Sequence, residues 1–211
     1  MRRVAVYIDG FNFYYGLKSA GGSTYRELLW LDFHALSSRL IRADQTLAMV
    51  KYFTARVARP PEKQDRQRIF LQAVEASGVQ ILEGQYQDNR LECRQCGSAW
   101  FVSKEKQTDV RIAVEMLKDA TLDRWDTAML VTGDSDLLPP IQALKEMYPG
   151  KRILVAFPPD RHKSAVRLKQ EAHGWFIIKL DQIRSSQLPD PVRTSDGYEL
   201  HRPRHWSVGA S

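Results

Sequence analysis

Four aspartates occupy positions from which their carboxylates could meet: Asp9, Asp109, Asp134 and Asp136. The first ends the apolar run VAVYI, the last two follow the run AMLVT, and Asp109 begins an amphipathic segment. Two unit charges about 4 Å apart repel by roughly 1 kcal/mol in water and about 4 kcal/mol at an effective dielectric constant near 20. A carboxylate cluster therefore usually has raised pKa values or holds a divalent cation. We interpret the four acids as a cation site suited to phosphodiester chemistry.

Alternating strands and helices are needed to bring these acids together. We expect strands at 4–8, 48–54, 79–82, 128–132 and 151–157 and helices near 32–42, 64–76, 106–120 and 139–147. This alternation predicts an α/β fold with three layers, α/β/α, around a mostly parallel sheet of about five strands. Sites in such sheets lie at the carboxyl ends of the strands, where Asp9, Asp134 and Asp136 would be. Asp109 shares the angular position of Ile112 on its helix, so we expect it to face the sheet.

Each of these polar residues also has an ordinary structural interpretation. Asp9 begins an Asp-Gly pair, which commonly forms a turn after a strand. Either Asp134 or Asp136 could cap the next helix, and Asp109 could complement a helix dipole. Asn12 could supply an oxygen ligand, hold a phosphate or cap a helix. Because all four acids point to one crevice, we favour the site over these separate interpretations.

Three further aspartates lie at the other end of the helix near 106–120: Asp119, Asp123 and Asp126. Aspartates are mostly exposed in folded proteins. We therefore expect these three to be solvated and assign them no role in the site.

Length and composition indicate one globular domain over residues 1–184, with a small insertion at about 85–103 that contains a CxxC motif. Residues 185–211 read as an extended C-terminal tail. No apolar run approaches the roughly 18–20 residues of a membrane span. The apolar run after the basic start is too short for a signal peptide. We therefore expect a cytoplasmic protein without membrane contact.

Three ordered motifs resemble the NYN domain of the PIN-like nuclease superfamily, in its bacterial LabA-like branch: YIDGFNFYYGL, EKQTDVRIAVEML and LVTGDSDLLPPI. The resemblance covers roughly residues 3–180. It implies the strand order 3-2-1-4-5 and a metal-dependent ribonuclease site. By the same resemblance, the catalytic acids that would hold Mg²⁺ or Mn²⁺ are Asp9, Asp109, Asp134 and Asp136, with Asn12 as polar support beside them.

The net charge of +6 is compatible with a polyanionic partner such as RNA. Two basic segments follow strands, and their expected RNA-binding residues are Arg56, Arg59, Lys63, Arg161 and Lys163. Arginine and lysine beside an acidic centre would hold the phosphate backbone. The aromatic segment 11–15 could stack on unpaired bases, although aromatic residues at this spacing are more often core.

The CRQCG segment, with Cys93 and Cys96, is half of a structural zinc pattern, which needs four ligands. The chain has no second cysteine pair and no histidine nearby. We favour a structural hairpin tip. A zinc ion shared between two subunits and a degenerate knuckle without metal are the alternatives.

The function expected from these features is metal-dependent endonucleolytic cleavage of RNA, either single-stranded or structured. The main alternative is a non-catalytic RNA-binding or regulatory module with the same fold. A phosphatase of the haloacid dehalogenase type ranks last, because it needs Asp-x-Asp after the first strand and Phe11 replaces the second acid. The sequence is also compatible with a homo-oligomer.

Overall fold

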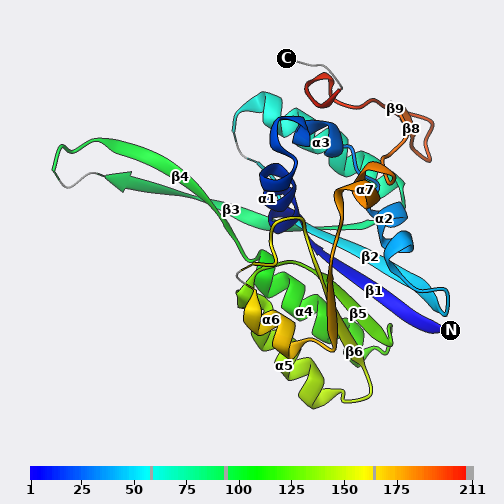
Figure 1. Cartoon of the computed structure of the whole chain (residues 1–211). Helices are drawn as coiled ribbons and strands as arrows, with labels where there is room; N and C mark the ends of the chain where they lie inside the picture. The colour runs from blue at the N-terminus through cyan, green and yellow to red at the C-terminus, as the bar shows by residue number, and fades with distance from the viewer. Residues whose placement is uncertain (58, 93–94, 164, 208–211) are drawn as a thin grey trace.

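Six parallel strands form the centre of the protein (Figure 1). The computed structural model describes residues 1–57, 59–92, 95–163 and 165–207, and for 85–91 and 100–106 it describes the backbone alone. The strands are β1 (Arg2–Asp9), β2 (Gln45–Ala55), β3 (Gln80–Glu92), β4 (Ala99–Lys106), β5 (Thr127–Val131), β6 (Arg152–Phe157) and β7 (Gly174–Ile177). Their order is β4-β3-β2-β1-β5-β6-β7, and only β4 is antiparallel to its neighbour. The predicted order 3-2-1-4-5 is confirmed and extended by β7, which is only four residues long.

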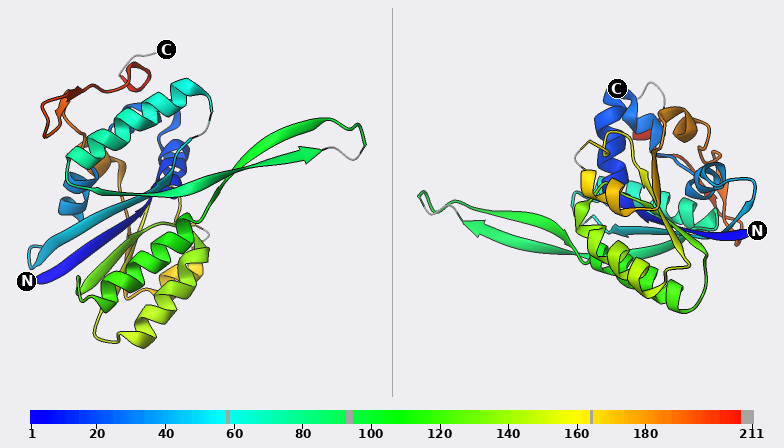
Figure 2. Two further views of the ribbon diagram at one scale, coloured as in Figure 1. Left: turned by 180° about the vertical axis from the view of Figure 1, so that it is seen from behind. Right: turned by 60° about the horizontal axis from the view of Figure 1, so that its bottom comes forward.

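Helices cover both faces of this sheet (Figure 2). One face carries α1 (Gly10–Ala20), α2 (Phe33–Leu40), α3 (Pro61–Ala76) and α7 (Leu180–Arg184), and the other carries α4 (Thr108–Thr121), α5 (Leu138–Met147) and α6 (Val166–Glu171). Among the described residues, no helix is both long and apolar enough to cross a membrane.

The alternation along β1 explains how one short apolar run serves both layers. Val6 and Ile8 join the hydrophobic cluster with α1, whereas Ala5 and Tyr7 join the cluster with α4. Successive side chains of a strand point to opposite faces, so a strand covered on both sides must be apolar throughout. Asp9 ends this run at the carboxyl edge of the sheet.

Strands β3 and β4 form a two-stranded arm that projects from the body (Figures 1 and 2). β3 pairs with β2 as far as Gly84 and then pairs with β4 along residues 85–92. The predicted insertion falls on this arm. Cys93 lies outside the described residues, whereas Cys96 is exposed with its Sγ 3.3 Å from the Oγ of Ser98. The choice between a hairpin tip and zinc stays a prediction.

The C-terminal segment, expected to be an extended tail, runs back over α3 as far as it is described. The side chains of Leu188 and Val192 in this segment are buried in the same hydrophobic cluster as the apolar face of α3. Trp206 packs edge-on against Phe70 of α3, with ring centroids 5.7 Å apart. Its short elements are β8 (Val192–Arg193), β9 (Glu199–Leu200) and the 3₁₀ helix η3 (Arg204–Trp206).

A buried ion pair connects β2 with α4, which corrects the expectation that Asp119 is solvated. Lys51 Nζ lies 2.5 Å from Asp119 Oδ2 and 2.6 Å from Glu115 Oε2, and Lys51 and Asp119 are 1% and 0% exposed. The hydroxyl of Tyr7 donates a further hydrogen bond of 2.8 Å to Asp119. Asp119 lies three residues after Met116, on the stripe of α4 that faces the sheet. An acid there is tolerated because a cation from the neighbouring strand pairs with it.

Candidate active site

The carboxyl ends of β1 and β5 lie side by side and define the position of the site. The two strands are parallel neighbours, with Ile8 opposite Val131. Asp9 therefore lies close to the loop that follows β5, and α4 begins beside both. These segments enclose a cavity of about 220 Å³, whose wall includes Asp9, Asp109, Asp134 and Arg161.

Asp9 is buried and held in a fixed orientation. Its Oδ1 accepts a hydrogen bond of 3.0 Å from the backbone N–H of Asn12, so Asp9 is also the N-cap of α1. Its Oδ2 accepts a bond of 2.9 Å from the hydroxyl of Thr132. Burial raises the pKa of Asp9 to about 6, these two bonds oppose the rise, and the charges of Asp109 and Asp134 add to it.

Asp109 lies in the first turn of α4 and faces the same cavity. Burial is the largest cause that raises its pKa, followed by repulsion from Asp134 and then Asp136. Beyond burial, repulsion from neighbouring acids contributes to the raised pKa of both Asp9 and Asp109, so these carboxylates interact electrostatically. A cation placed in the cavity would relieve this repulsion.

The two acids after β5 differ in their positions. Asp134 lines the cavity and caps the 3₁₀ helix η2 (Ser135–Leu137), because its Oδ1 accepts a bond of 3.0 Å from the backbone N–H of Asp136. Asp136 is exposed and is not among the residues that line the cavity. Three of the four predicted acids therefore line one cavity, and the charge of the fourth, Asp136, raises the pKa of Asp109 from outside it.

Asn12 connects α1 to the loop after β5. Its side-chain Oδ1 accepts a bond of 2.9 Å from the backbone N–H of Gly133. The oxygen is thus used within the protein, which favours a positioning role over the oxygen ligand considered from the sequence. Gly133 is itself required, because a Cβ there would overlap the carbonyl oxygen of Arg161.

The sequence analysis missed three residues of the cavity region: Gln107, Thr108 and Thr132. Thr132 is fully buried and also accepts a bond of 3.1 Å from the backbone N–H of Asp134, so it connects two of the acids. Its position directly between a strand and the acids was the available signal. Gln107 has a left-handed backbone with φ of 76°. Such a conformation is uncommon for a residue other than glycine and often occurs at functional sites.

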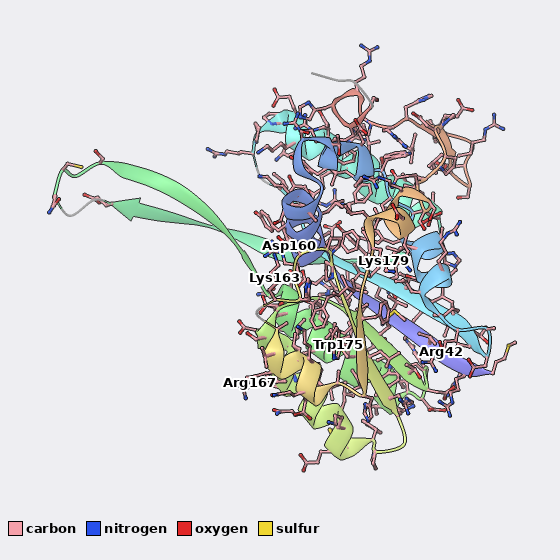
Figure 3. All side chains as sticks on the ribbon, viewed as in Figure 1. Arg42, Asp160, Lys163, Arg167, Trp175 and Lys179 are labelled. Carbon is pink, nitrogen blue, oxygen red and sulfur yellow. The ribbon has the colours of Figure 1, made fainter. Side chains whose placement is uncertain are left out.

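The five predicted RNA-binding cations lie in different surroundings. Arg161 lines the acidic cavity, with its guanidinium 5.9 Å from the ring centroid of Tyr15. Arg56 pairs with Glu83 at 2.6 Å. Lys163 pairs with Asp160 at 2.6 Å in the loop after β6 (Figure 3). The structure thus brings one predicted cation to the acids, while Arg56 and Lys163 form ion pairs elsewhere.

The remaining two, Arg59 and Lys63, line a second and larger cavity of about 560 Å³, here called the aromatic pocket. It lies between α1, the 3₁₀ helix η1 (Gly22–Leu28), α3 and the C-terminal segment. Its wall carries rings from all of these elements, including Tyr14, Tyr25, Phe70 and Trp206. Aromatic walls with a few polar groups are typical of ligand sites of this size.

The residues of the acidic cavity fit a hydrated divalent cation. Within the described part of the chain, no group of three or more His, Cys, Asp or Glu side chains is arranged as a complete metal site. Mg²⁺, however, usually takes only one or two protein carboxylates and keeps several waters. Asp9, Asp109 and Asp134 offer hard oxygen donors around a cavity with room for water.

The pKa of Asp9 predicts a dependence of stability on pH in metal-free protein. Between the ordinary value of 3.8 and about 6, the folded state binds more protons than the unfolded state, so the free energy of unfolding falls as pH rises. The loss is roughly 3 kcal/mol at pH 7.5. Asp9→Asn removes this loss and keeps a capping side chain. In EDTA, we expect the variant to be more stable than wild type at pH 7.5 and nearly equal at pH 4.

Urea unfolding at both pH values measures this difference. A gain in stability that is the same at pH 4 and pH 7.5 would show that the charge of Asp9 is not its cause.

Comparison with known proteins supports this fold and shows the family of the chain. The chain matches the NYN domain family over residues 3–180 and belongs to that family of PIN-like nucleases. A Pseudomonas putida protein named 6-hydroxy-3-succinoylpyridine 3-monooxygenase HspA is 33% identical over 180 residues, which cover 68% of this chain and 55% of that protein. The chain thus spans about half the length of this curated relative. A Vibrio parahaemolyticus protein of unknown function shares the fold, with a TM-score of 0.56, 18% identity and coverage of 85% of this chain and 94% of that chain.

Proposed function

We propose that this protein is a metal-dependent endoribonuclease of the cytoplasm whose active site is the acidic cavity. One observation carries the proposal: carboxylates from β1, α4 and the loop after β5 face a single polar cavity that also has Arg161 in its wall. Membership in the NYN family supports the same chemistry.

The charged residues of the cavity then each have a part in phosphodiester hydrolysis. Mg²⁺ or Mn²⁺, when bound, would supply a water of lowered pKa and neutralise charge on the phosphate. Asp9, Asp109 and Asp134 would hold the cation, and Thr132 keeps the carboxylate of Asp9 in place. Arg161 binds a phosphate oxygen through its guanidinium.

Cleavage of an internally labelled single-stranded RNA tests this function directly. We expect cleavage with Mn²⁺ or Mg²⁺, loss of cleavage in EDTA and recovery when excess Mn²⁺ is restored. Internal products of intermediate length would identify an endonuclease. RNA that binds but stays intact with either metal would instead favour the non-catalytic RNA-binding or regulatory module. Cleavage that persists in EDTA would contradict the metal site.

A second candidate function is the binding of a small heteroaromatic acid. The name of the Pseudomonas putida relative refers to a pyridine compound, and the aromatic pocket combines rings with basic residues. Calorimetric titration with 6-hydroxy-3-succinoylpyridine tests this candidate. Saturable binding that is lost in Tyr25→Ala would support it, and no heat of binding at two well-separated temperatures would exclude it.

A further inference from the structure

The aromatic pocket adjoins the acidic cavity. Phe11 and Tyr15 line both of them. These two residues are four apart on α1, so their side chains lie on the same face of the helix. One face of α1 therefore separates the three carboxylates from the aromatic pocket, and a ligand that fills both sites would pass over it.

The two cavities have opposite charge. Five basic residues line the aromatic pocket, and no Asp or Glu does: Lys18, Arg26, Arg59, Lys63 and Arg66. Within the described part of the chain, none of the five forms an ion pair. Cations that lack acidic partners and surround a ring-lined pocket suit a ligand that is both flat and anionic.

Three tyrosine rings lead from one cavity into the other. Tyr14 packs edge-on against Tyr15 at 5.3 Å and against Tyr25 at 6.2 Å between ring centroids. Guanidinium groups lie 5.9 Å from the ring centroids at both ends of this row: Arg161 at Tyr15 and Arg26 at Tyr25. Tyr15 is half exposed, unlike the ring of Phe33, which is buried at the floor of the pocket.

We propose that the aromatic pocket receives an unpaired nucleotide of the RNA, next to the phosphate bound in the acidic cavity. The base lies against the tyrosine rings, and the phosphates of this nucleotide and its neighbour lie against the basic residues. The identity of the ligand as RNA rests on the proposed function. Because a paired base cannot leave its helix without a cost, the enzyme selects single-stranded RNA at this position.

Binding to RNA that lacks a base tests the proposal without any cleavage. The probes are a fluorescein-labelled single-stranded octanucleotide of RNA and the same chain with abasic ribose at its central positions, both measured by anisotropy in EDTA. Stacking of one base predicts that the intact RNA binds about 5- to 150-fold more tightly. Equal affinity of the two probes would overturn the proposal.

Two pairs of variants assign the effect to the aromatic pocket. Tyr25→Ala should reduce the preference for intact RNA to less than about twofold, whereas Tyr198→Ala, on a side chain that is 70% exposed in the C-terminal segment, should keep it. Arg66→Gln should lower the slope of log affinity against log salt by roughly 0.7 to 1. Arg167→Gln, on α6 (Figure 3), which packs on the opposite face of the sheet from α3, should leave the slope unchanged. A preference that persists in Tyr25→Ala would place stacking elsewhere and overturn the proposal.

The outcomes separate this inference from the proposed function. If the wild type cleaves RNA in a metal-dependent manner but binds intact and abasic RNA equally, the proposed nuclease function is retained and the nucleotide pocket is rejected. Failure to bind either probe would reject the nucleotide pocket, whereas the cleavage assay with Mn²⁺ would still decide the proposed function, because binding is measured in EDTA. Competition of intact RNA by 6-hydroxy-3-succinoylpyridine, together with equal binding of the two probes, would assign the pocket to the small acid instead.

Discussion

Asp109→Asn is expected to lower kcat for RNA cleavage by roughly 100- to 1,000-fold at saturating Mn²⁺, as is typical when one essential electrostatic group is removed from an active site. Asparagine nearly keeps the shape of the side chain and removes its charge. The residue faces the acidic cavity and interacts with the charges of Asp134 and Asp136. Its loss therefore weakens the cation site while the fold stays intact. Single-turnover cleavage of labelled RNA gives the rate.

Asp123→Asn is the matched control. It makes the same chemical change just beyond the far end of α4, at a side chain that is 71% exposed and paired with Arg3 and Lys151. Its left-handed backbone, with φ of 50°, suits asparagine. We expect wild-type cleavage from this variant. Full activity in Asp109→Asn would mean that Asp109 is not part of the site or that the cleavage comes from a contaminating nuclease.

Lys51→Met is expected to lower the free energy of unfolding by about 3–5 kcal/mol, the range measured when one partner of a buried ion pair is removed. Asp119 and Glu115 would then be left without the cation that connects β2 to α4. Arg124, which is 3.1 Å from Asp119, compensates only in part because it is itself half exposed. A domain of this kind has about 5–15 kcal/mol of stability in total. Urea unfolding at pH 7 measures the loss.

Lys118→Met is the control for this prediction. Lys118 also pairs with Glu115, at 3.4 Å, but its side chain is 53% exposed. Surface pairs contribute about 0–1 kcal/mol, so this variant should remain close to wild type. The double variant Lys51→Met, Asp119→Leu should recover most of the stability, because an apolar pair of similar volume removes the two fully buried charges and Glu115 keeps Lys118 as its partner. A Lys51→Met variant no less stable than Lys118→Met would contradict the role of the buried pair.

Local sequence patterns were sufficient to place the acids on one edge of the sheet. The apolar runs of β1 and β5 end in Asp9 and just before Asp134, and parallel strands of an α/β sheet present their carboxyl ends together. Helical spacing likewise placed Asp109 on the face of α4 that meets the sheet. These features depend only on residues a few positions apart, which is why they could be predicted.

The same kind of pattern failed where the decisive partner is distant in the chain. Asp119 was expected to be solvated, and its partner Lys51 lies 68 positions away on β2. Arg56, expected near the acids from its place after β2, pairs with Glu83, which lies 27 positions away on β3, and its role in RNA binding stays a prediction. A long charged side chain pairs with whichever partner the packing brings near. Local sequence patterns do not indicate which partner that is.

The sequence by itself determined the alternation of strands and helices, the family and the edge of the sheet on which the carboxylates gather. Only the tertiary structure decided that Asp136 stays at the rim, that Thr132 holds Asp9 and that Arg161 reaches the cavity. It also joined helix α1, helix α3 and the C-terminal segment around one aromatic pocket. Periodicity arises from neighbouring residues, whereas cavities and hydrogen-bond partners arise from the register and packing of segments far apart in the chain.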